Sequence, residues 1–176
     1  MVARSGAGNV IMSSTAELRA VRQWFGAWEV SLPDAVSVVH VSEYLAGKLH
    51  DFEFVGDEEA VGYHDCAWLG RALAVYDEPR AVVTAASGRA PLELPSARGT
   101  AHSSGAGTSM YLTGTRLAGE IARMLLEEAE EAGMRALVTA NPVDAAHLGR
   151  TAGVTGSPVR VVELAMFVAA RLESAA

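Results

Sequence analysis

The sequence predicts an α/β protein with a largely parallel sheet flanked by helices. Along its 176 residues, short β-branched segments of strand length alternate with segments of helical periodicity. Several of the expected helices begin at a capping residue or a proline and end at a glycine. Alternation of this kind places strands side by side in parallel, with helices on the sheet faces.

The first third of the chain contains two expected strand–helix units. Residues 8–12 form a short apolar strand, and residues 13–25 follow as a helix with apolar side chains at helical spacing. Residues 35–41 form a β-branched strand that leads into a helix at 42–49. Residues 51–59 are acidic and are expected to form a loop.

The middle of the chain begins with a strand at 60–64 and a helix at 69–75. Residues 77–86 form a second helix, which an aspartate and a first-turn proline open and a glycine closes. Residues 90–94 form a short strand between prolines. Residues 101–114 are rich in glycine and serine, have no periodicity, and are expected to form a loop.

The last third contains the clearest helix, residues 115–132, which ends at a glycine. Its apolar stripe is expected to comprise Leu117, Ile121, Met124 and Leu125, with Glu128 at the edge. A buried strand at 136–140 runs into Asn141 and Pro142, which open a helix to about residue 149. A strand at 159–164 and a helix at 165–172 complete the fold.

An internal repeat predicts two lobes. Residues 36–49 match residues 159–172 without a gap, and upstream of each copy a strand enters a capped helix, at 8–18 and at 135–148. We therefore expect a truncated N-terminal lobe at residues 1–59 and a complete C-terminal lobe at residues 60–176, packed as one compact domain. The alternative is that any two strand–helix units look alike.

Charge and hydropathy narrow the function classes. Fourteen basic residues against 21 acidic ones give a net charge of −7, and no basic stripe is present, so nucleic-acid binding is not expected. We find no apolar run of signal-peptide or membrane-span length, so a cytoplasmic protein without membrane contact is expected. The Ala/Gly/Val/Arg-rich composition is typical of a bacterial source.

Cys66 is the only cysteine, which excludes a disulfide framework. It also excludes any site built mainly from thiolates, such as a zinc ribbon or an iron–sulfur cluster.

Four short segments, in order and at suitable spacing, resemble one known family. They are residues 63–71 (YHDCAWLGR, against YHDPCHLGR), 75–80 (VYDEPR, against YxxPR), 103–107 (SSGAG, against CCGxGG) and 137–144 (LVTANPVD, against LVTxCPxC). The family is the cysteine-rich CCG domain of heterodisulfide reductase and of the iron–sulfur subunits of glycolate oxidase and lactate utilisation. The resemblance covers about two thirds of the chain, and residues before Tyr63 look like the tail of a preceding CCG lobe.

Every cysteine-ligand position of that family is replaced in this chain, and Cys66 falls on the family's proline. The replaced positions are Ala67, Ser103, Ser104, Asn141 and Asp144. The resemblance therefore implies the fold without the cluster, because serine and alanine cannot hold iron as thiolates do. We expect no cofactor; a zinc or iron site remains an alternative, although no HxxxH or HxH spacing supports it.

The resemblance implies that polar side chains lie together in a pocket where the family holds its cluster. The candidate catalytic residues are His102, Asp144, His64 and Cys66, and the candidate substrate-binding residues are Arg71, Ser103, Ser104, Gly105, Asn141 and Trp68. Imidazoles transfer protons near neutral pH, and the helix N-terminus at Asn141 and the glycine-containing loop offer N–H donors to an anion.

Each candidate also has a structural alternative. Cys66 is an ordinary small buried residue, Arg71 is the partner of a structural Asp65, and Asn141 is a helix cap. Ser103 and Ser104 satisfy loop backbone. His40, His50 and His147 are assigned to surface or helical positions. Trp24, Trp28 and Trp68 are assigned to the core, with a place at the pocket as the alternative for Trp68.

These observations favour a cluster-free enzyme of small-molecule metabolism, for example in biosynthesis. It would act on an anionic or carbonyl-bearing metabolite by acid–base chemistry, namely isomerisation, cyclisation, elimination or hydrolysis. The alternative is a non-catalytic pseudo-cluster subunit that scaffolds or regulates a partner oxidoreductase. A homodimer is also expected, because a truncated lobe leaves an apolar face uncovered.

Overall fold

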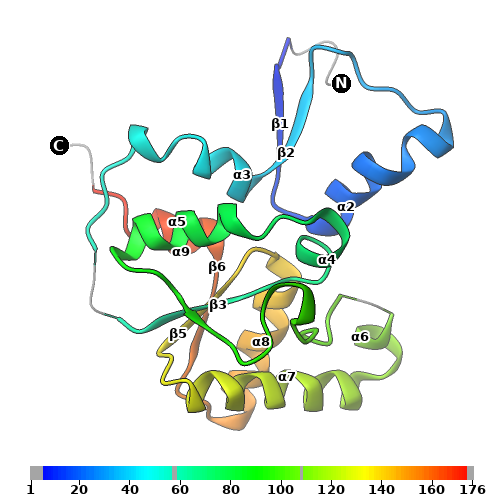
Figure 1. Ribbon diagram of the computed structural model, residues 1–176. Coiled ribbons are helices and arrows are strands. Elements are labelled where there is room, and N and C mark those ends of the chain that lie inside the picture. Colours follow the sequence, from blue (N-terminus) through cyan, green and yellow to red (C-terminus); the bar gives the residue numbers. More distant parts are fainter. Residues whose placement is uncertain (1–5, 57–58, 108, 174–176) are drawn as a thin grey trace.

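The structure, a computed structural model, describes residues 6–56, 59–107 and 109–173 and confirms the α/β class (Figure 1). Two separate sheets are present, and every strand pair in them is parallel. The smaller sheet pairs β1 (Asn9–Met12) with β2 (Ser37–His40). The larger sheet has the order β4-β3-β5-β6, formed by Leu92–Glu93, Val61–His64, Ala136–Thr139 and Arg160–Glu163.

The helices connect these strands in the alternating order that the sequence predicts. They are α2 (Thr15–Arg19), α3 (Val41–Ala46), α4 (Gly70–Leu73), α5 (Asp77–Ser87), α6 (Met110–Thr113), α7 (Thr115–Glu131), α8 (Pro142–Thr155) and α9 (Leu164–Ala169). A π-helical segment, Ala20–Trp24, continues α2, and single 3-10 turns lie at Gly26–Trp28, Leu49–Asp51 and Arg98–Thr100. Among the described residues, no helix is both long enough and apolar enough to cross a bilayer.

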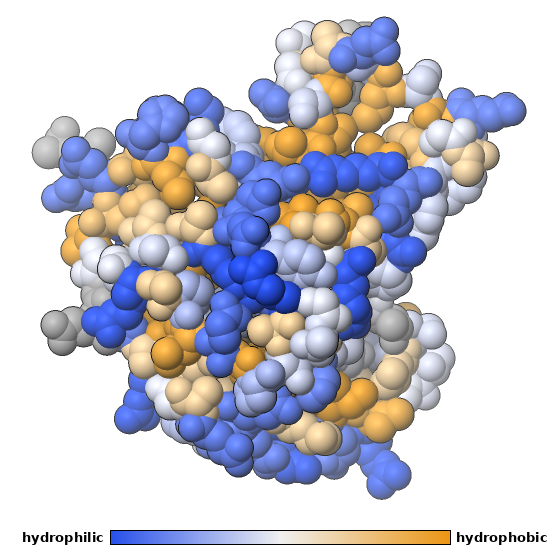
Figure 2. Space-filling model, viewed as in Figure 1, coloured by the Kyte–Doolittle hydropathy of each residue, from blue (hydrophilic) through white to orange (hydrophobic). Residues whose placement is uncertain are grey.

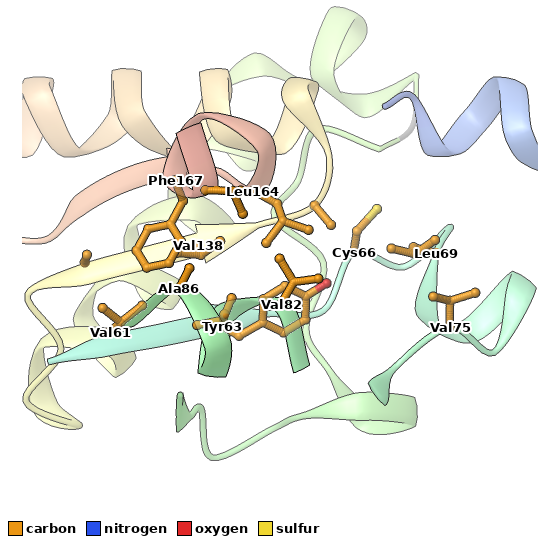
Figure 3. Close-up of a cluster of buried hydrophobic side chains, with 14 of the residues drawn as sticks. Val61, Tyr63, Cys66, Leu69, Val75, Val82, Ala86, Val138, Leu164 and Phe167 are labelled. Atoms are coloured by element: carbon orange, nitrogen blue, oxygen red, sulfur yellow. The ribbon is translucent and has the colours of Figure 1, made fainter. Parts of the chain in front are cut away.

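The larger sheet lies between two helical layers, each with its own apolar core. Val61, Tyr63 and Val138 point toward α5 and α9, where they meet side chains such as Val82 and Phe167 (Figure 3). Leu137, one residue from Val138, points to the opposite face and joins the core beneath α7 and α8. This alternation is the period-two pattern of a strand that is buried on both faces.

The carboxyl ends of the smaller sheet meet the body of the molecule. β1 and β2 project from the body of the molecule, and the helices α2 and α3 begin where these strands meet it (Figure 1). Met12 and Val38 pack against the core under α5 and α9. Thr15 reaches Cys66, with 3.4 Å between the hydroxyl oxygen and the sulfur. The residues that follow β1 therefore border those that follow β3.

The second strand–helix unit of each half has the same layout. β2 and α3 begin and end 123 residues before β6 and α9, from Ser37 against Arg160 to Ala46 against Ala169. His40 and Glu163 occupy the same place in the two units, and each side chain accepts a hydrogen bond from the backbone of its helix. The shared layout agrees with the sequence repeat; the division into two lobes stays a prediction.

Several expectations for the helices are wrong. α8 continues through Gly149 and ends only where Gly156 adopts a positive φ of 74°. The segment expected as a loop contains α6. The buried stripe of α7 is made of Ala118, Ala122, Leu125, Leu126 and Ala129. Small alanines let α7 approach the sheet closely, so Leu117 and Met124 lie on its exposed side.

The tryptophans and histidines also differ from expectation. Trp24 and Trp28 are exposed and lie beside each other, with ring centroids 5.6 Å apart. His40 and His147 are buried. His40 lies where β2 meets the larger body, and His147 faces α7. Only the helical position of His147 could be inferred from sequence, because burial of a single polar residue has no periodic signal.

Candidate functional site

Three of the positions that the resemblance aligns with cluster cysteines form one buried polar network. Asp144 lies in the first turn of α8 and accepts hydrogen bonds from the Ser104 hydroxyl and, at 3.0 Å, from the Asn141 side-chain amide. All three side chains are almost inaccessible to solvent. Both Asp144 oxygens therefore have donors, and the Asn141 side chain does not cap the helix backbone as expected.

Ser103 and Ser104 each make the local turn that fixes the loop. The Gly105 N–H donates to the Ser103 hydroxyl at 3.2 Å, and the Ala106 N–H donates to the Ser104 hydroxyl at 3.1 Å. Gly105 has a φ of +89°, and a Cβ there would lie 2.7 Å from the Ala118 carbonyl oxygen. Glycine is therefore required, both for its conformation and for the close approach to α7.

Cys66 is a buried member of the core rather than a reactive thiol. Its side chain lies at the end of the apolar cluster beside Leu69 (Figure 3). Burial, followed by the nearby Asp144 carboxylate, raises the pKa of its thiol to about 12. A nucleophilic cysteine needs the thiolate, so these surroundings favour the structural interpretation of Cys66.

His64 ends β3 and is also fully buried. One ring nitrogen lies 3.0 Å from the His102 carbonyl oxygen and the other lies 3.5 Å from the Thr139 hydroxyl. Because a carbonyl only accepts, the nitrogen facing it carries the proton. His64 therefore links the end of the sheet to the serine loop.

The His102 side chain points away from this network. It is 57% exposed and lies 3.3 Å from a Glu128 carboxylate oxygen on α7. Its other ring nitrogen lies 3.4 Å from the Ser96 hydroxyl. In the described part of the chain no hydrogen bond or ion pair joins the His102 side chain to Asp144, so the structure does not bring these two candidate catalytic residues together.

The expected partnership of Arg71 with Asp65 is wrong. Asp65 is buried and receives two hydrogen bonds, of 2.9 and 2.7 Å, from Arg80 on α5. The Arg98 backbone N–H supplies a third, at 2.7 Å. Arg80 also binds Glu93 through two nitrogens. Asp65 and Arg80 therefore have a structural role. Arg71 takes no part in this ion pair.

Arg71 instead borders a pocket of about 380 Å³. We call it the Arg19–Arg71 pocket; its lining comprises Arg19, Ala67, Trp68, Arg71, Ala72, Ser103, Gly107 and Met110. Three of the residues assigned to substrate binding from sequence meet here, namely Trp68, Arg71 and Ser103. A volume of this size suits a small metabolite.

Two guanidinium groups and an indole shape the pocket. Arg71 donates to the Ala101 carbonyl oxygen, which anchors its side chain. Arg19 lies over the Trp68 ring, 4.2 Å from its centroid, and donates to Gln23. The Trp68 indole N–H in turn donates to the Gly107 carbonyl oxygen at 2.7 Å, which fixes the ring.

Arg19 could not be identified from the sequence. It lies in α2, whose buried residues are Thr15 and Leu18, and no sequence motif distinguishes it from an ordinary surface arginine. Packing of α2 against the segment after β3 brings it beside Trp68. An arginine four residues before a glutamine on a helix is typical of a solvated surface pair, so sequence alone assigns it no ligand role.

The five positions that the resemblance aligns with cluster cysteines thus have two environments. Ser104, Asn141 and Asp144 bind one another in the interior, whereas Ala67 and Ser103 line the pocket. The pocket carries two guanidinium groups and one hydroxyl, that of Ser103, which suit a carboxylate, a phosphate or a developing oxyanion. Within the described ranges, we find no group of three or more His, Cys, Asp or Glu side chains arranged to hold a metal ion.

Comparison with known proteins identifies no family for this chain. No family model matches it, and no curated protein sequence matches it significantly. The functional argument therefore rests on the geometry of the site.

Proposed function

We propose that this protein binds a small anionic metabolite, bearing a carboxylate or phosphate beside a planar or carbonyl group, in the Arg19–Arg71 pocket. The observation that carries the proposal is the convergence of Arg19, Trp68, Arg71 and Ser103 on one cavity. Guanidinium groups bind planar oxyanions through paired hydrogen bonds, and an indole face accepts a planar group. A cytoplasmic location fits such a ligand and is part of the proposal.

Acid–base chemistry on this ligand is the enzymatic form of the proposal. The two guanidinium groups would stabilise negative charge that develops on a carbonyl oxygen, which isomerisation and elimination next to a carboxylate require. Ser103 would donate its hydroxyl to the ligand, since its oxygen already accepts from Gly105. This hypothesis assigns proton transfer to the Asp144 carboxylate, which accepts from the hydroxyl of Ser104, the residue after Ser103.

A specific observation favours the second candidate, a non-catalytic subunit that binds a metabolite and regulates a partner oxidoreductase. None of the four residues assigned to catalysis, His64, Cys66, His102 and Asp144, lines the pocket described here. Binding is therefore better supported than turnover.

Isothermal titration with pyruvate, glycolate, malate, glyceraldehyde 3-phosphate and inorganic phosphate tests the binding proposal. We expect at least one of these anions to bind, and Arg19→Gln and Arg71→Gln each to weaken it at least about tenfold, because each removes charge-assisted hydrogen bonds. Arg89→Gln, at an exposed arginine outside the pocket, is the matched control. Equal affinities for all three variants, or no binding by any anion, would contradict the proposal.

Proton NMR in D₂O separates the two candidates. An enzyme that moves protons next to a carbonyl exchanges the α-protons of its ligand with solvent, even without net conversion. The enzymatic form predicts such exchange for a bound anion that carries α-protons, and its loss in Asp144→Asn. Binding without exchange supports the non-catalytic subunit, and unchanged exchange in Asp144→Asn excludes Asp144 as the proton-transfer group.

A further inference from the structure

A second and larger cavity, of about 630 Å³, lies between α6, α7 and α8. We call it the α6–α8 groove. It shares no lining residue with the Arg19–Arg71 pocket. The two cavities lie on either side of α6: Met110 lines the pocket, and the next two residues, Tyr111 and Leu112, line the groove.

The walls of the groove are largely apolar. Leu112 and Val154 are 79% and 83% exposed, which is unusual for aliphatic side chains. The Tyr111 ring packs edge-on against the buried His147, with centroids 5.1 Å apart. Figure 2 shows hydrophobic surface over the α6 end of α7. Leu112 and Val154 thus expose their aliphatic side chains to the same cavity, from helices on different sides of it.

Positive charge surrounds this apolar lining. Arg116, Arg123 and Arg150 all border the groove, against a single carboxylate, Glu120. Arg123 is bound to Glu120 and Glu127. Arg116 and Arg150 form no ion pair or hydrogen bond with any described residue. On a chain of net charge −7, two uncompensated guanidinium groups beside an apolar cavity form a locally positive site.

Gly119 leaves the floor of the groove open. A Cβ at this position would have nothing within 4 Å, although the residue lies inside α7. Glycine is unfavourable in a helix interior, and no close contact in the structure requires it here. Any side chain at this position would occupy the space that a ligand would fill.

We propose that the α6–α8 groove is a second ligand site, which binds a small carboxylic acid with an apolar body. The apolar body lies against Tyr111, Leu112 and Val154, over the open backbone of Gly119. The carboxylate pairs with Arg116 and Arg150, whose planar donors match its two oxygens. A cavity of this volume holds a molecule of roughly drug size, such as a medium-chain fatty acid or an aryl carboxylic acid.

Titration with octanoate tests the site, and octanamide serves as its uncharged analogue. We expect octanoate to bind, octanamide to bind at least about tenfold more weakly, and Arg116→Gln and Arg150→Gln each to weaken octanoate about fivefold or more. Gly119→Leu fills the groove and abolishes binding. Gly153→Leu is the matched control, because Gly153 is also a helical glycine with an open Cβ position but lies outside the groove.

Other variants distinguish this site from the first pocket and from a membrane surface. Arg19→Gln and Arg89→Gln leave octanoate binding unchanged if the groove is the site. The proposal is overturned if wild type does not bind millimolar octanoate, if Gly119→Leu binds it normally, or if octanamide binds equally well. It is also overturned if the protein sediments with phosphatidylglycerol vesicles and excess octanoate does not release it.

Discussion

At the scale of single residues, the buried charge of Asp65 has the clearest energetic consequence. Its carboxylate is 2% exposed and is paired with Arg80, which is 10% exposed. Removing Arg80 leaves the Asp65 carboxylate buried without a counter-charge, whereas Arg80 without Asp65 keeps Glu93 as an ion partner. We therefore expect Arg80→Ala to lower the free energy of unfolding by about 3–5 kcal/mol.

Chemical denaturation measures this loss. Lys48→Ala breaks an exposed ion pair with Asp51 and is the control, with an expected change below about 1 kcal/mol. Equal and small effects of the two substitutions would show that the Asp65–Arg80 pair is not buried as described.

Burial raises the pKa of the Cys66 thiol to about 12, so the rate at which a thiol reagent modifies Cys66 reports whether the side chain is buried. At pH 8 almost no thiolate forms, and the side chain is covered by core residues. We expect a disulfide reagent such as dithionitrobenzoate to modify native protein far more slowly than unfolded protein. Rapid stoichiometric labelling of the native state would reverse the structural assignment and make Cys66 a candidate nucleophile again.

Burial lowers the pKa of His40 below its usual value of 6.5. Its ring accepts from the Ser42 backbone N–H at 3.1 Å and faces the Ser13 carbonyl oxygen, so the neutral form fits the site. The unfolded chain then takes up a proton that the folded chain excludes. Stability contributed by neutral His40 is present above pH 6.5 and falls as pH drops from there toward the lowered pKa.

Denaturation curves at several pH values, compared with those of His40→Gln, isolate this contribution. The difference between wild type and variant should shrink below pH 6.5, the usual pKa of the imidazole. A difference that stays constant from about pH 8 to about pH 5 would show that His40 does not titrate in folding.

Only part of the site is predictable from sequence at this scale. On the resemblance, one pocket is expected to hold Trp68, Arg71, Ser103, Ser104, Asn141 and Asp144. In the structure the first three line a pocket, whereas the last three bind one another in the interior. The sequence does not identify Arg19, and the alternative that pairs Asp65 with Arg71 is wrong, because Asp65 binds Arg80. Both errors depend on side-chain direction and on contacts between distant segments, which a one-dimensional pattern does not contain.

At the scale of elements, Glu163 stabilises the start of α9. One of its carboxylate oxygens accepts from the Ala165 and Met166 backbone N–H groups, at 2.8 and 3.2 Å. Burial raises the pKa of this carboxyl. We expect Glu163→Ala to destabilise the protein by about 1 kcal/mol through loss of the cap.

Glu163→Gln separates capping from charge, because its amide oxygen can accept the same hydrogen bonds. It should retain most of the stability that Glu163→Ala loses, as thermal or urea denaturation can measure. A loss in Glu163→Gln equal to that in Glu163→Ala would indicate that the charge, not the cap, is required.

The existence and order of elements are easier to predict than their ends. Strands of β-branched residues and the Asn141–Pro142 helix start are local signals, and the structure has them where expected. α8 extends past the expected end because its interior glycines are tolerated once the helix packs against β6; a Cβ at Gly149 would lie 3.9 Å from Val161. α6 is only four residues long and has no periodicity to detect.

At the scale of the whole molecule, the N-terminal region presents uncovered apolar surface. Trp28 is 58% exposed, and Ile11, in β1 of the two-stranded sheet, is 46% exposed. Figure 2 shows hydrophobic surface on this projecting part of the molecule. Such surfaces favour association, so a homodimer remains our prediction. Sedimentation equilibrium of wild type should give twice the mass of 18.4 kDa, and Trp28→Lys should shift it toward monomer. A monomeric wild type at tens of micromolar would contradict the prediction.

The fold also bears on the resemblance to CCG domains, through the positions at which the replaced cysteines would lie. The five positions aligned with cluster cysteines lie in one region, at the carboxyl ends of β3 and β5 and in the intervening loop. That placement agrees with the resemblance, which stays a prediction. This region contains the buried Ser104–Asn141–Asp144 network on one side and the Arg19–Arg71 pocket on the other.

The most direct test of that pocket is the indole region of a ¹H–¹⁵N NMR spectrum during titration with the anion that binds. The chain has three tryptophans, and the Trp68 N–H is hydrogen-bonded at the pocket while the exposed Trp28 lies outside it. Assignment follows from single Trp→Phe variants. We predict that the Trp68 indole signal shifts with saturation while the Trp28 signal stays in place; a ligand that binds without moving the Trp68 signal would contradict the proposed site.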